Sequence, residues 1–215
     1  MFQIVSGLEH LHNQHDIVHR DLKPENILYS LIKDGQYVMK LADFGCSRTL
    51  PKGGTHYTRT ITNNGQSYTL RRFGTDGWLA PEFLKGGRQF TYKGDIFPLG
   101  LIFAFILCNG LHPFGDDSTT RDNRIRNGYD PMVPLKEILD DGSYKLIQRM
   151  LNTDPTERPG ASQVLHDEIF AGNQQSINQP ADTAMGNSRV IWKVIQRNVE
   201  VRIFHFDFCC LQFYL

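Results

Sequence analysis

The sequence of 215 residues has no apolar run long enough to cross a membrane. Its longest one, LIFAFILC, extends only from Leu101 to Cys108, whereas a membrane-spanning helix needs about 20 apolar residues. The first residues, MFQIVSGLEHLH, lack the basic start and long apolar core of a signal peptide. We therefore expect no membrane span in this chain and a cytoplasmic location.

The sequence also has no net charge and little cysteine. Lys plus Arg and Asp plus Glu number 23 each, so the charge balance favours no direct binding of nucleic acid or of an anionic membrane. The adjacent Cys209 and Cys210 do not easily bridge, and with Cys46 and Cys108 they show no zinc-ligand spacing. We expect free thiols in a reducing compartment. A hydrophobic content of 40% is enough for a real core.

Three short motifs follow one another in an informative order. His19–Asn26 reads HRDLKPEN, Ala42–Gly45 reads ADFG, and Ala80–Glu82 reads APE. Each of them alone fits an ordinary loop, and DFG in particular is a weak tripeptide. Together and in this order they match the catalytic-loop, metal-binding and activation-segment signatures of phosphoryl-transfer enzymes.

The residue types in these motifs suit that chemistry. Phosphoryl transfer from ATP needs an acceptor for the proton of the substrate hydroxyl and oxygen ligands for magnesium. Asp21 suits the first task. Asn26 and Asp43 suit the second, because hard cations such as Mg²⁺ take oxygen ligands. We predict Asp21 as the catalytic base, and Asn26 and Asp43 as ligands of the metal and its nucleotide.

The hydrophobic periodicity predicts a mainly α-helical fold with one small β-hairpin. Apolar residues at helical spacing indicate a helix over residues 2–13. Two short apolar segments flank Lys33-Asp34-Gly35, a turn signal that predicts a hairpin leading to Asp43. From Tyr92 to Phe170 the pattern is helical, with one hydrophobic helix closed by Gly110. Pro98 is expected near the start of that helix, where a missing N–H costs least.

On these motifs the chain resembles the C-terminal lobe of a eukaryotic protein kinase, and Lys23 in DLKPEN resembles the serine/threonine kinases. The resemblance implies that Asp21 takes the proton of the acceptor hydroxyl and that Lys23 sits near the transferred phosphate of ATP. It assigns His19 to bracing the loop. Arg20 would pair with a phosphate on the activation loop, since Arg clamps phosphate oxygens. The Thr- and Ser-rich residues 46–73 supply the candidate phosphorylation sites.

The stretch GTDGWLAPE, residues 74–82, resembles the substrate-facing end of that loop and is called the substrate loop below. The resemblance implies that Thr75 bonds toward Asp21 and Lys23. It also implies a buried ion pair between Glu82 and Arg158. Asp95 would accept backbone N–H bonds from the catalytic loop.

Further details are similar to the inositol-requiring kinase/endoribonuclease family of unfolded-protein-response sensors. They are Trp78, the DIF at Asp95–Phe97, HPFG at His112–Gly115 and the following RDNRIRNG; Pro98 departs from the usual Ser. This resemblance implies a protein substrate and self-association with a like kinase. In the family the full-length protein lies in the endoplasmic reticulum membrane, with its kinase on the cytosolic side.

The rest of the kinase pattern is not found in these residues. No Gly-rich phosphate loop, no Val-Ala-Ile-Lys strand and no helix with the Glu partner of that Lys stand before His19. We therefore expect residues 1–170 to form the C-terminal lobe without an N-terminal lobe. Residues 171–188 read as a small-polar linker. Residues 189–215 form a tail of unknown structure, aromatic-rich and partly alternating.

Two classes of function follow. The first is the catalytic half of a serine/threonine kinase, inactive until an N-terminal lobe is supplied. The second is a non-catalytic binding module that docks substrates or competes with a full-length stress-sensor kinase/endoribonuclease. Asp21, Asn26 and Asp43 together favour an enzyme, because a dedicated binding module has no physical need for all three.

Overall fold

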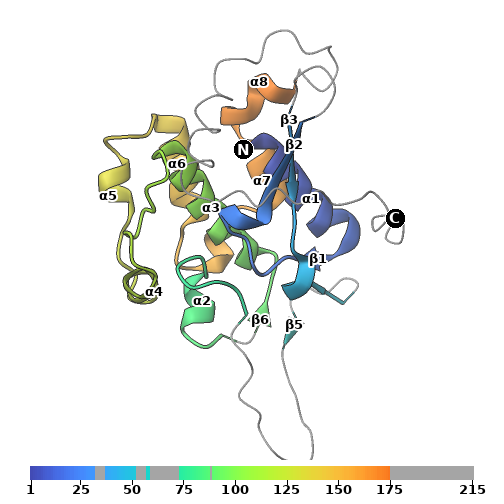
Figure 1. Cartoon of the computed structure of the whole chain (residues 1–215), viewed down its shortest axis with the longest axis horizontal. Helices are drawn as coiled ribbons and strands as arrows, with labels where there is room; N and C mark the ends of the chain where they lie inside the picture. The colour runs from blue at the N-terminus through green and yellow to red at the C-terminus, as the bar shows by residue number, and fades with distance from the viewer. Residues whose placement is uncertain (32–36, 52–56, 59–72, 88, 175–215) are drawn as a thin grey trace, which may run out of the picture.

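The computed structural model describes the chain except for residues 32–36, 52–56, 59–72, 88 and 175–215. Within the described part, helices surround the central α3 (Lys93–Leu107). Figure 1 shows α1 (Phe2–His15) and the hairpin of β2 (Ile27–Leu31) and β3 (Tyr37–Leu41) on one side of it. On the other side lie α4 (Ser118–Arg126), α5 (Met132–Leu135) and α6 (Asp141–Met150). The predicted mainly α-helical fold is confirmed.

Helix α3 forms the core because its sequence is apolar on every side. Its residues from Gly94 to Ile106 are all buried, as expected of a helix that has no polar face. The chain leaves the helix through a Schellman motif, in which the N–H of Gly110 donates to the carbonyl of Phe105 at 2.8 Å. Asn109, with a φ of 53°, holds the left-handed position. The predicted end of this helix is therefore confirmed, with Asn109 beside Gly110.

The expectation for Pro98 was wrong. Helix α3 begins at Lys93, so Pro98 lies inside it rather than in the first turn. The helix begins with the polar first turn at Lys93 to Asp95, from which the Asp95 carboxylate reaches the backbone of the catalytic loop. Proline at this position removes one helical hydrogen bond and crowds the carbonyl four residues earlier, which belongs to Gly94.

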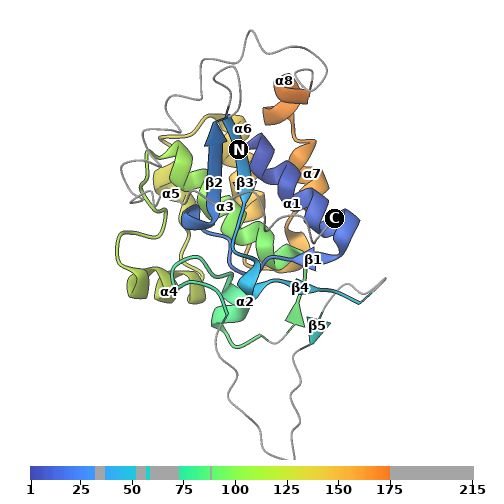
Figure 2. The same cartoon turned by 45° about the vertical axis from the view of Figure 1, so that its right-hand side comes forward.

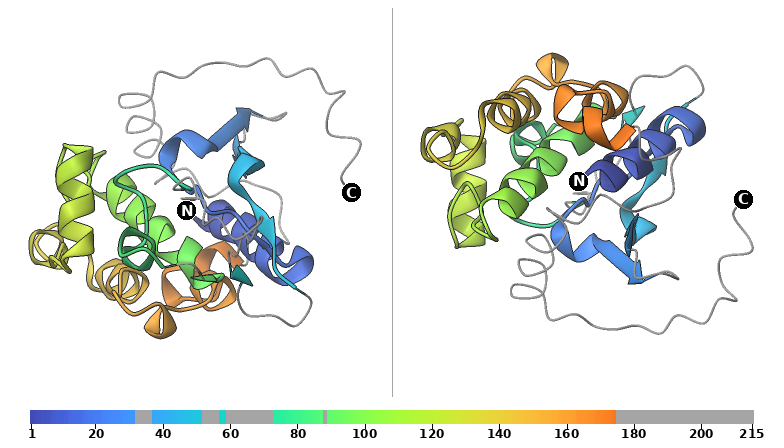
Figure 3. Two further views of the ribbon diagram at one scale, coloured as in Figure 1. Left: turned by 90° about the horizontal axis from the view of Figure 1, so that it is seen from below. Right: turned by 90° about the horizontal axis from the view of Figure 1, so that it is seen from above.

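The amphipathic helix α1 extends to His15, slightly beyond the predicted range. Its buried face carries Ile4, Val5, Leu8 and His12 and packs against α7 (Ala161–Leu165) and strand β3. The predicted hairpin is also confirmed, with Ile27 opposite Leu41 and Leu31 opposite Tyr37 in an antiparallel register. Both views in Figure 3 place this hairpin on the side of the lobe away from α4.

Two more antiparallel pairs connect segments near the catalytic loop. Strand β1 (Ile17–Val18) pairs with β4 (Arg48–Thr49), and β5 (Tyr57–Thr58) pairs with β6 (Gln89–Phe90). The short helix α2 (Pro81–Leu84) lies at the lower end of the lobe, as Figure 2 shows, and contacts α4.

Helical structure continues past the expected end of the lobe. Helix α7 is followed by a 3₁₀ turn at Glu168–Phe170 and by α8 (Ala171–Gln174), so the first residues of the predicted linker are helical. The remaining linker and the tail lie outside the described residues. So do most of the candidate phosphorylation sites, including Thr60, Thr62 and Ser67. No helix in the described part is long and apolar enough to span a bilayer.

Gly100 tests the packing of α3 on α6. A Cβ at Gly100 would lie 2.9 Å from Cβ of Met150 and 3.1 Å from Cδ2 of Leu151. We expect Gly100→Ala to lower the free energy of unfolding by about 1–3 kcal/mol, because overpacking outweighs the better helix propensity of alanine. Urea unfolding followed by circular dichroism measures this.

Gly172 in α8 provides the matched control. Nothing lies within 4 Å of a Cβ built there, so Gly172→Ala should leave the unfolding midpoint nearly unchanged. A Gly100→Ala variant as stable as the parent would show that α3 and α6 separate more easily than their contacts indicate.

Candidate active site

The catalytic loop is fixed from below by the carboxylate of Asp95. Its Oδ2 accepts the backbone N–H of His19 at 2.7 Å, and its Oδ1 accepts that of Arg20 at 2.8 Å. Oδ2 also lies 2.9 Å from Nε2 of His12, on helix α1. Arg20 adopts a left-handed φ of 68°, and its own N–H and that of the preceding His19 are both held by Asp95. The predicted acceptor role of Asp95 is confirmed.

The same contacts set the charge state of Asp95. Burial disfavours the charged carboxylate, but the hydrogen bond and charge of His12 and the N–H of His19 outweigh it, so the net pKa of Asp95 is lowered. His12 was not predicted from the sequence. A signal was present, because a histidine four residues after Leu8 continues the buried stripe of α1, and a buried polar side chain needs a partner.

His19 connects the two motifs. It is fully buried, and its Nε2 lies 3.0 Å from the carbonyl of Ala42, directly before Asp43. Its ring also packs on that of Phe44, with the centroids 5.2 Å apart. The bracing position expected of His19 is therefore found.

The side chains of Asp21, Lys23 and Thr75 contact one another in the part of the catalytic loop that follows His19 and Arg20. The hydroxyl of Thr75 donates to Oδ1 of Asp21 at 2.7 Å, and Nζ of Lys23 donates to Oγ1 of Thr75 at 2.7 Å. Lys23 also lies 3.1 Å from Oδ2 of Asp21. The contacts expected of Thr75 are present, and the three side chains form one hydrogen-bonded group.

Asn26 is bonded into this group through its amide nitrogen. Nδ2 lies 2.8 Å from the carbonyl of Asp21 and 3.3 Å from its Oδ2, which turns the amide oxygen away from Asp21. The N–H of Ala42 donates to the carbonyl of Asn26 at 2.9 Å, so Asn26 and Asp43 leave the same end of the hairpin. The Asp43 side chain belongs to an exposed residue with a left-handed φ of 60°.

These oxygen donors fit a magnesium ion. The described residues contain no cluster of three or more His, Cys, Asp or Glu that could hold a metal alone. Magnesium usually takes only one or two protein ligands and completes its octahedron with phosphate oxygens and water. An amide and a carboxylate at one end of a hairpin are such a pair.

Arg20 reaches toward the activation segment from the opposite side of the loop. Its Nε donates to the carbonyl of Cys46 at 2.5 Å. Its guanidinium lies 4.5 Å from the ring centroid of Phe73 and 4.9 Å from that of Phe90. Arg20 thus contacts both ends of the predicted activation loop. The proposed phosphate partner falls mainly among residues outside the described part.

The far end of the substrate loop is fixed by an ion pair between the buried Arg158 and the partly exposed Glu82. Nη1 and Nη2 of Arg158 donate to the two carboxylate oxygens of Glu82 at 2.8 and 2.7 Å. Arg158 is 1% exposed and also donates to the carbonyls of Lys93 and Asn152. This bidentate pair, which was predicted, ties α2 to the beginning of α3 and to the 3₁₀ turn at Pro155–Glu157.

His112 is buried beneath the substrate loop, against Trp78. Its Nδ1 accepts the N–H of Phe114 at 3.1 Å, and its ring centroid is 4.7 Å from that of Trp78. Burial, together with the nearby charge of Arg121, lowers the pKa of His112 to about 3, although the Gly77 backbone offsets part of the shift. The imidazole is therefore neutral near pH 7 and packs as an aromatic ring.

Comparison with known proteins agrees with these motifs. The protein kinase domain family model matches residues 1–170. The chain is 38% identical over 170 residues to serine/threonine-protein kinase/endoribonuclease IRE1b of Arabidopsis thaliana, covering 79% of this chain and 18% of the relative. It is 39% identical over 173 residues to serine/threonine-protein kinase/endoribonuclease IRE2 of Homo sapiens, covering 78% and 18%.

A third relative is the "Sensor for unfolded proteins in the ER ire1" of Schizosaccharomyces pombe. The identity is 31% over 195 residues, covering 79% of this chain and 17% of the relative. The chain therefore spans about a fifth of the length of the curated relatives that it matches.

The environment of His112 predicts a pH dependence of stability. In the unfolded chain His112 takes up a proton near its ordinary pKa of 6.5, but in the folded protein it does so only near 3. The unfolded state therefore binds more protons between these values. The contribution of neutral His112 to the stability of the folded protein is complete above pH 6.5. It is lost progressively as the pH falls toward 3, at up to about 1.4 kcal/mol per pH unit.

Urea unfolding at several pH values between 7 and 4 tests this expectation. His112→Gln should flatten the slope of the free energy of unfolding by about 1 kcal/mol per pH unit, because glutamine does not titrate. His166→Gln changes an exposed histidine at the end of α7 and should leave the slope in place. Equal slopes in the parent and His112→Gln would contradict a neutral buried His112.

Proposed function

This chain belongs to the protein kinase family, and we propose that residues 1–170 supply the catalytic lobe of a serine/threonine kinase of the kinase/endoribonuclease type. The reaction is transfer of the γ-phosphoryl group of ATP to a Ser or Thr hydroxyl of a protein. The observation that carries the proposal is the hydrogen-bonded group of Asp21, Lys23 and Thr75, with Asn26 bonded to Asp21.

In this proposal Asp21 is the base. Its Oδ1 already accepts a hydrogen bond from the hydroxyl of Thr75, so the carboxylate is oriented to accept a proton from a substrate hydroxyl. The Lys23 ammonium, 3.1 Å from Asp21, brings positive charge to the place where the phosphoryl group is transferred. Asp21 would thus act on the substrate hydroxyl, and Lys23 on the negative charge of the transferred phosphoryl group.

Asn26 and Asp43 would hold Mg²⁺, and Lys23, Asn26 and Asp43 would contact the nucleotide. When bound, the metal neutralises the charge of the phosphates. The contribution of this chain is to present an amide oxygen and a carboxylate from one end of the hairpin. The bonds of Asn26 to Asp21 place the predicted metal ligand directly beside the predicted base.

Arg20 is proposed to read the state of the activation loop. A phosphate adds nearly two negative charges and three acceptor oxygens, for which a guanidinium is a strong partner. Arg20 lies next to Asp21 and contacts Cys46 and Phe73 at the two ends of that loop. A phosphate bound by Arg20 would therefore change the contacts of Arg20 with both ends of the loop, directly beside Asp21.

The relatives suggest the context of the whole protein. Two of them are named as both kinases and endoribonucleases, and one is named as a sensor for unfolded proteins in the ER. On this ground we assign the chain to unfolded-protein-response signalling on the cytosolic side of the endoplasmic reticulum membrane. Its partners would be a protein substrate and a like kinase. Residues 1–170 would form the kinase lobe, 171–188 the linker and 189–215 a separate tail.

The 215 residues alone are expected to bind nucleotide weakly. They contain Asn26 and Asp43 but no Gly-rich loop to cover the phosphates. Titration calorimetry with Mg-ATP should give a dissociation constant above roughly 100 μM, with no autophosphorylation. Micromolar affinity together with phosphate transfer by this chain would contradict the expectation. Weak binding combined with capture of a complete like kinase would favour the non-catalytic binding module.

The variant Asp21→Asn distinguishes the role of the catalytic base from the role of the metal ligands. In a protein that carries a complete kinase domain, we expect turnover to fall by about 10²–10⁴-fold, because the amide cannot take the proton. The KM for ATP should stay nearly unchanged, since Asn26 and Asp43 are intact. Steady-state phosphorylation of a peptide measures both constants. If the variant mainly raised the KM for ATP, Asp21 would instead belong to the nucleotide site.

A further inference from the structure

Helix α4 contacts the middle of the substrate loop through a buried carboxylate. Oδ1 of Asp122 accepts the backbone N–H of Gly77 at 2.8 Å, and Asp122 is 6% exposed. The two residues are 45 positions apart in the sequence. A hydrogen bond from a buried N–H to a carboxylate is among the stronger ones in proteins, and the N–H becomes costly when the acceptor is removed.

Gly77 suits this close approach in two ways. Its φ of 85° lies in the left-handed region, which glycine adopts without strain. A Cβ at this position would lie 2.9 Å from Cδ of Arg121, the residue before Asp122. The backbone of the substrate loop therefore lies directly against α4.

One turn carries both this contact and the contact to the catalytic loop. The N–H of Trp78 donates to the carbonyl of Thr75 at 3.1 Å, which closes a turn over residues 75–78. Gly77 is bonded to α4, while the hydroxyl of Thr75 is bonded to Asp21 and Lys23. The turn is thus held between α4 and the catalytic loop.

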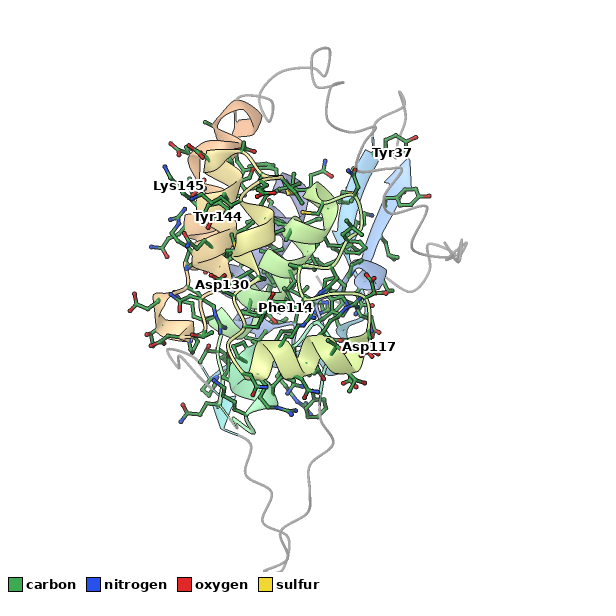
Figure 4. The ribbon with its side chains drawn as sticks, turned by 90° about the vertical axis from the view of Figure 1, so that its left-hand side faces the viewer. Tyr37, Phe114, Asp117, Asp130, Tyr144 and Lys145 are labelled. Carbon is green, nitrogen blue, oxygen red and sulfur yellow. The ribbon has the colours of Figure 1, made fainter. Side chains whose placement is uncertain are left out.

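Helix α4 is itself fixed to the lobe. Ile125 is 1% exposed, and arginines on the helix donate to carbonyls of neighbouring segments. Arg124 donates to Phe114 at 2.9 Å, and Arg126 donates to Leu84, at the end of α2, at 3.2 Å. Figure 4 shows α4 lying across this face of the lobe, with Asp117 at its beginning and Phe114 close by. Asp122 is therefore presented by an anchored helix.

We propose that Asp122 is a positioning residue for the phosphoryl-transfer site. By holding the N–H of Gly77, it sets the turn that places the Thr75 hydroxyl between Asp21 and Lys23, and so it helps to orient the base. Asp122 acts through the substrate loop and does not touch the reacting atoms. The inference deepens the proposed kinase function and rests on it for its catalytic part, while its structural part can be tested separately.

The structural part is tested by amide hydrogen exchange, measured by NMR on the ¹⁵N-labelled 215-residue chain. Asp122→Ala should accelerate exchange at Gly77 and Trp78 by roughly tenfold or more, because a buried donor loses its acceptor. Asp122→Asn should keep the protection, since its Oδ1 can accept the same N–H. Asn123→Ala changes the next, exposed residue of α4 and should have no effect at Gly77.

Two results would overturn this part. The first is unchanged exchange at Gly77 in Asp122→Ala. The second is an equal acceleration throughout α3, which would mean that Asp122 merely supports the fold. If Asp122→Ala does not fold, Gly77→Ala disturbs the same turn from the loop side. It should accelerate exchange at Trp78 while α4 stays protected, and unchanged exchange at Trp78 would again overturn the proposal.

The catalytic part is tested in a protein with a complete kinase domain. Asp122→Ala should lower kcat toward a peptide by roughly tenfold or more, leave the KM for ATP within about twofold, and be rescued by Asp122→Asn. Faster exchange at Gly77 with an unchanged kcat would overturn the positioning role and leave the kinase assignment standing. A parent protein that phosphorylates no protein would overturn the assignment, and exchange alone would then decide whether Asp122 holds the loop.

Discussion

The arrangement of the site depends on one buried carboxylate. Asp95 accepts the backbone N–H groups of His19 and Arg20 and is itself held by His12. A charged group at 1% exposure is costly unless every lone pair is used. Here the donors come from the catalytic loop and from α1, so the carboxylate is stable only when those segments meet. The position of Asp21, directly after Arg20, follows from this requirement.

A second constraint fixes the opposite end of the site. The guanidinium of Arg158 binds Glu82 in a bidentate manner and also donates to carbonyls of Lys93 and Asn152. Glu82 ends the substrate loop, and Asp95 stands near the start of α3, whose first residue is Lys93. The first turn of α3 is thus bonded to both loops. This explains why the helix begins with a polar turn and carries Pro98 in its interior rather than at its start.

The sequence predicted contacts between two residues of recognisable motifs better than contacts made by residues outside them, whatever their separation along the chain. The bonds of Thr75 to Asp21 and Lys23, the pair of Glu82 and Arg158, and the hairpin were all expected, because each involves a residue in a recognisable pattern. His12 and Asp122 were missed, since nothing in local spacing shows which distant N–H or carboxylate they meet. The position of Pro98 within its helix was predicted wrongly, because the hydrophobic run suggests that the helix begins later than Lys93, which is its first residue in the structure.

Buried charges of this kind contribute little net stability, because desolvation offsets most of their attraction. An apolar core could support the same helices with fewer penalties. What the buried Asp95 and Arg158 provide is direction, since a carboxylate or guanidinium that must satisfy several partners allows only one placement of the loops bonded to it. The group of Asp21, Lys23 and Thr75 is held together by hydrogen bonds, and Asp21 directly follows Arg20, whose backbone N–H is bonded to Asp95. Its precision therefore derives from the buried charged residues beneath it, and the cost of burying them is tied to the chemistry rather than to the fold.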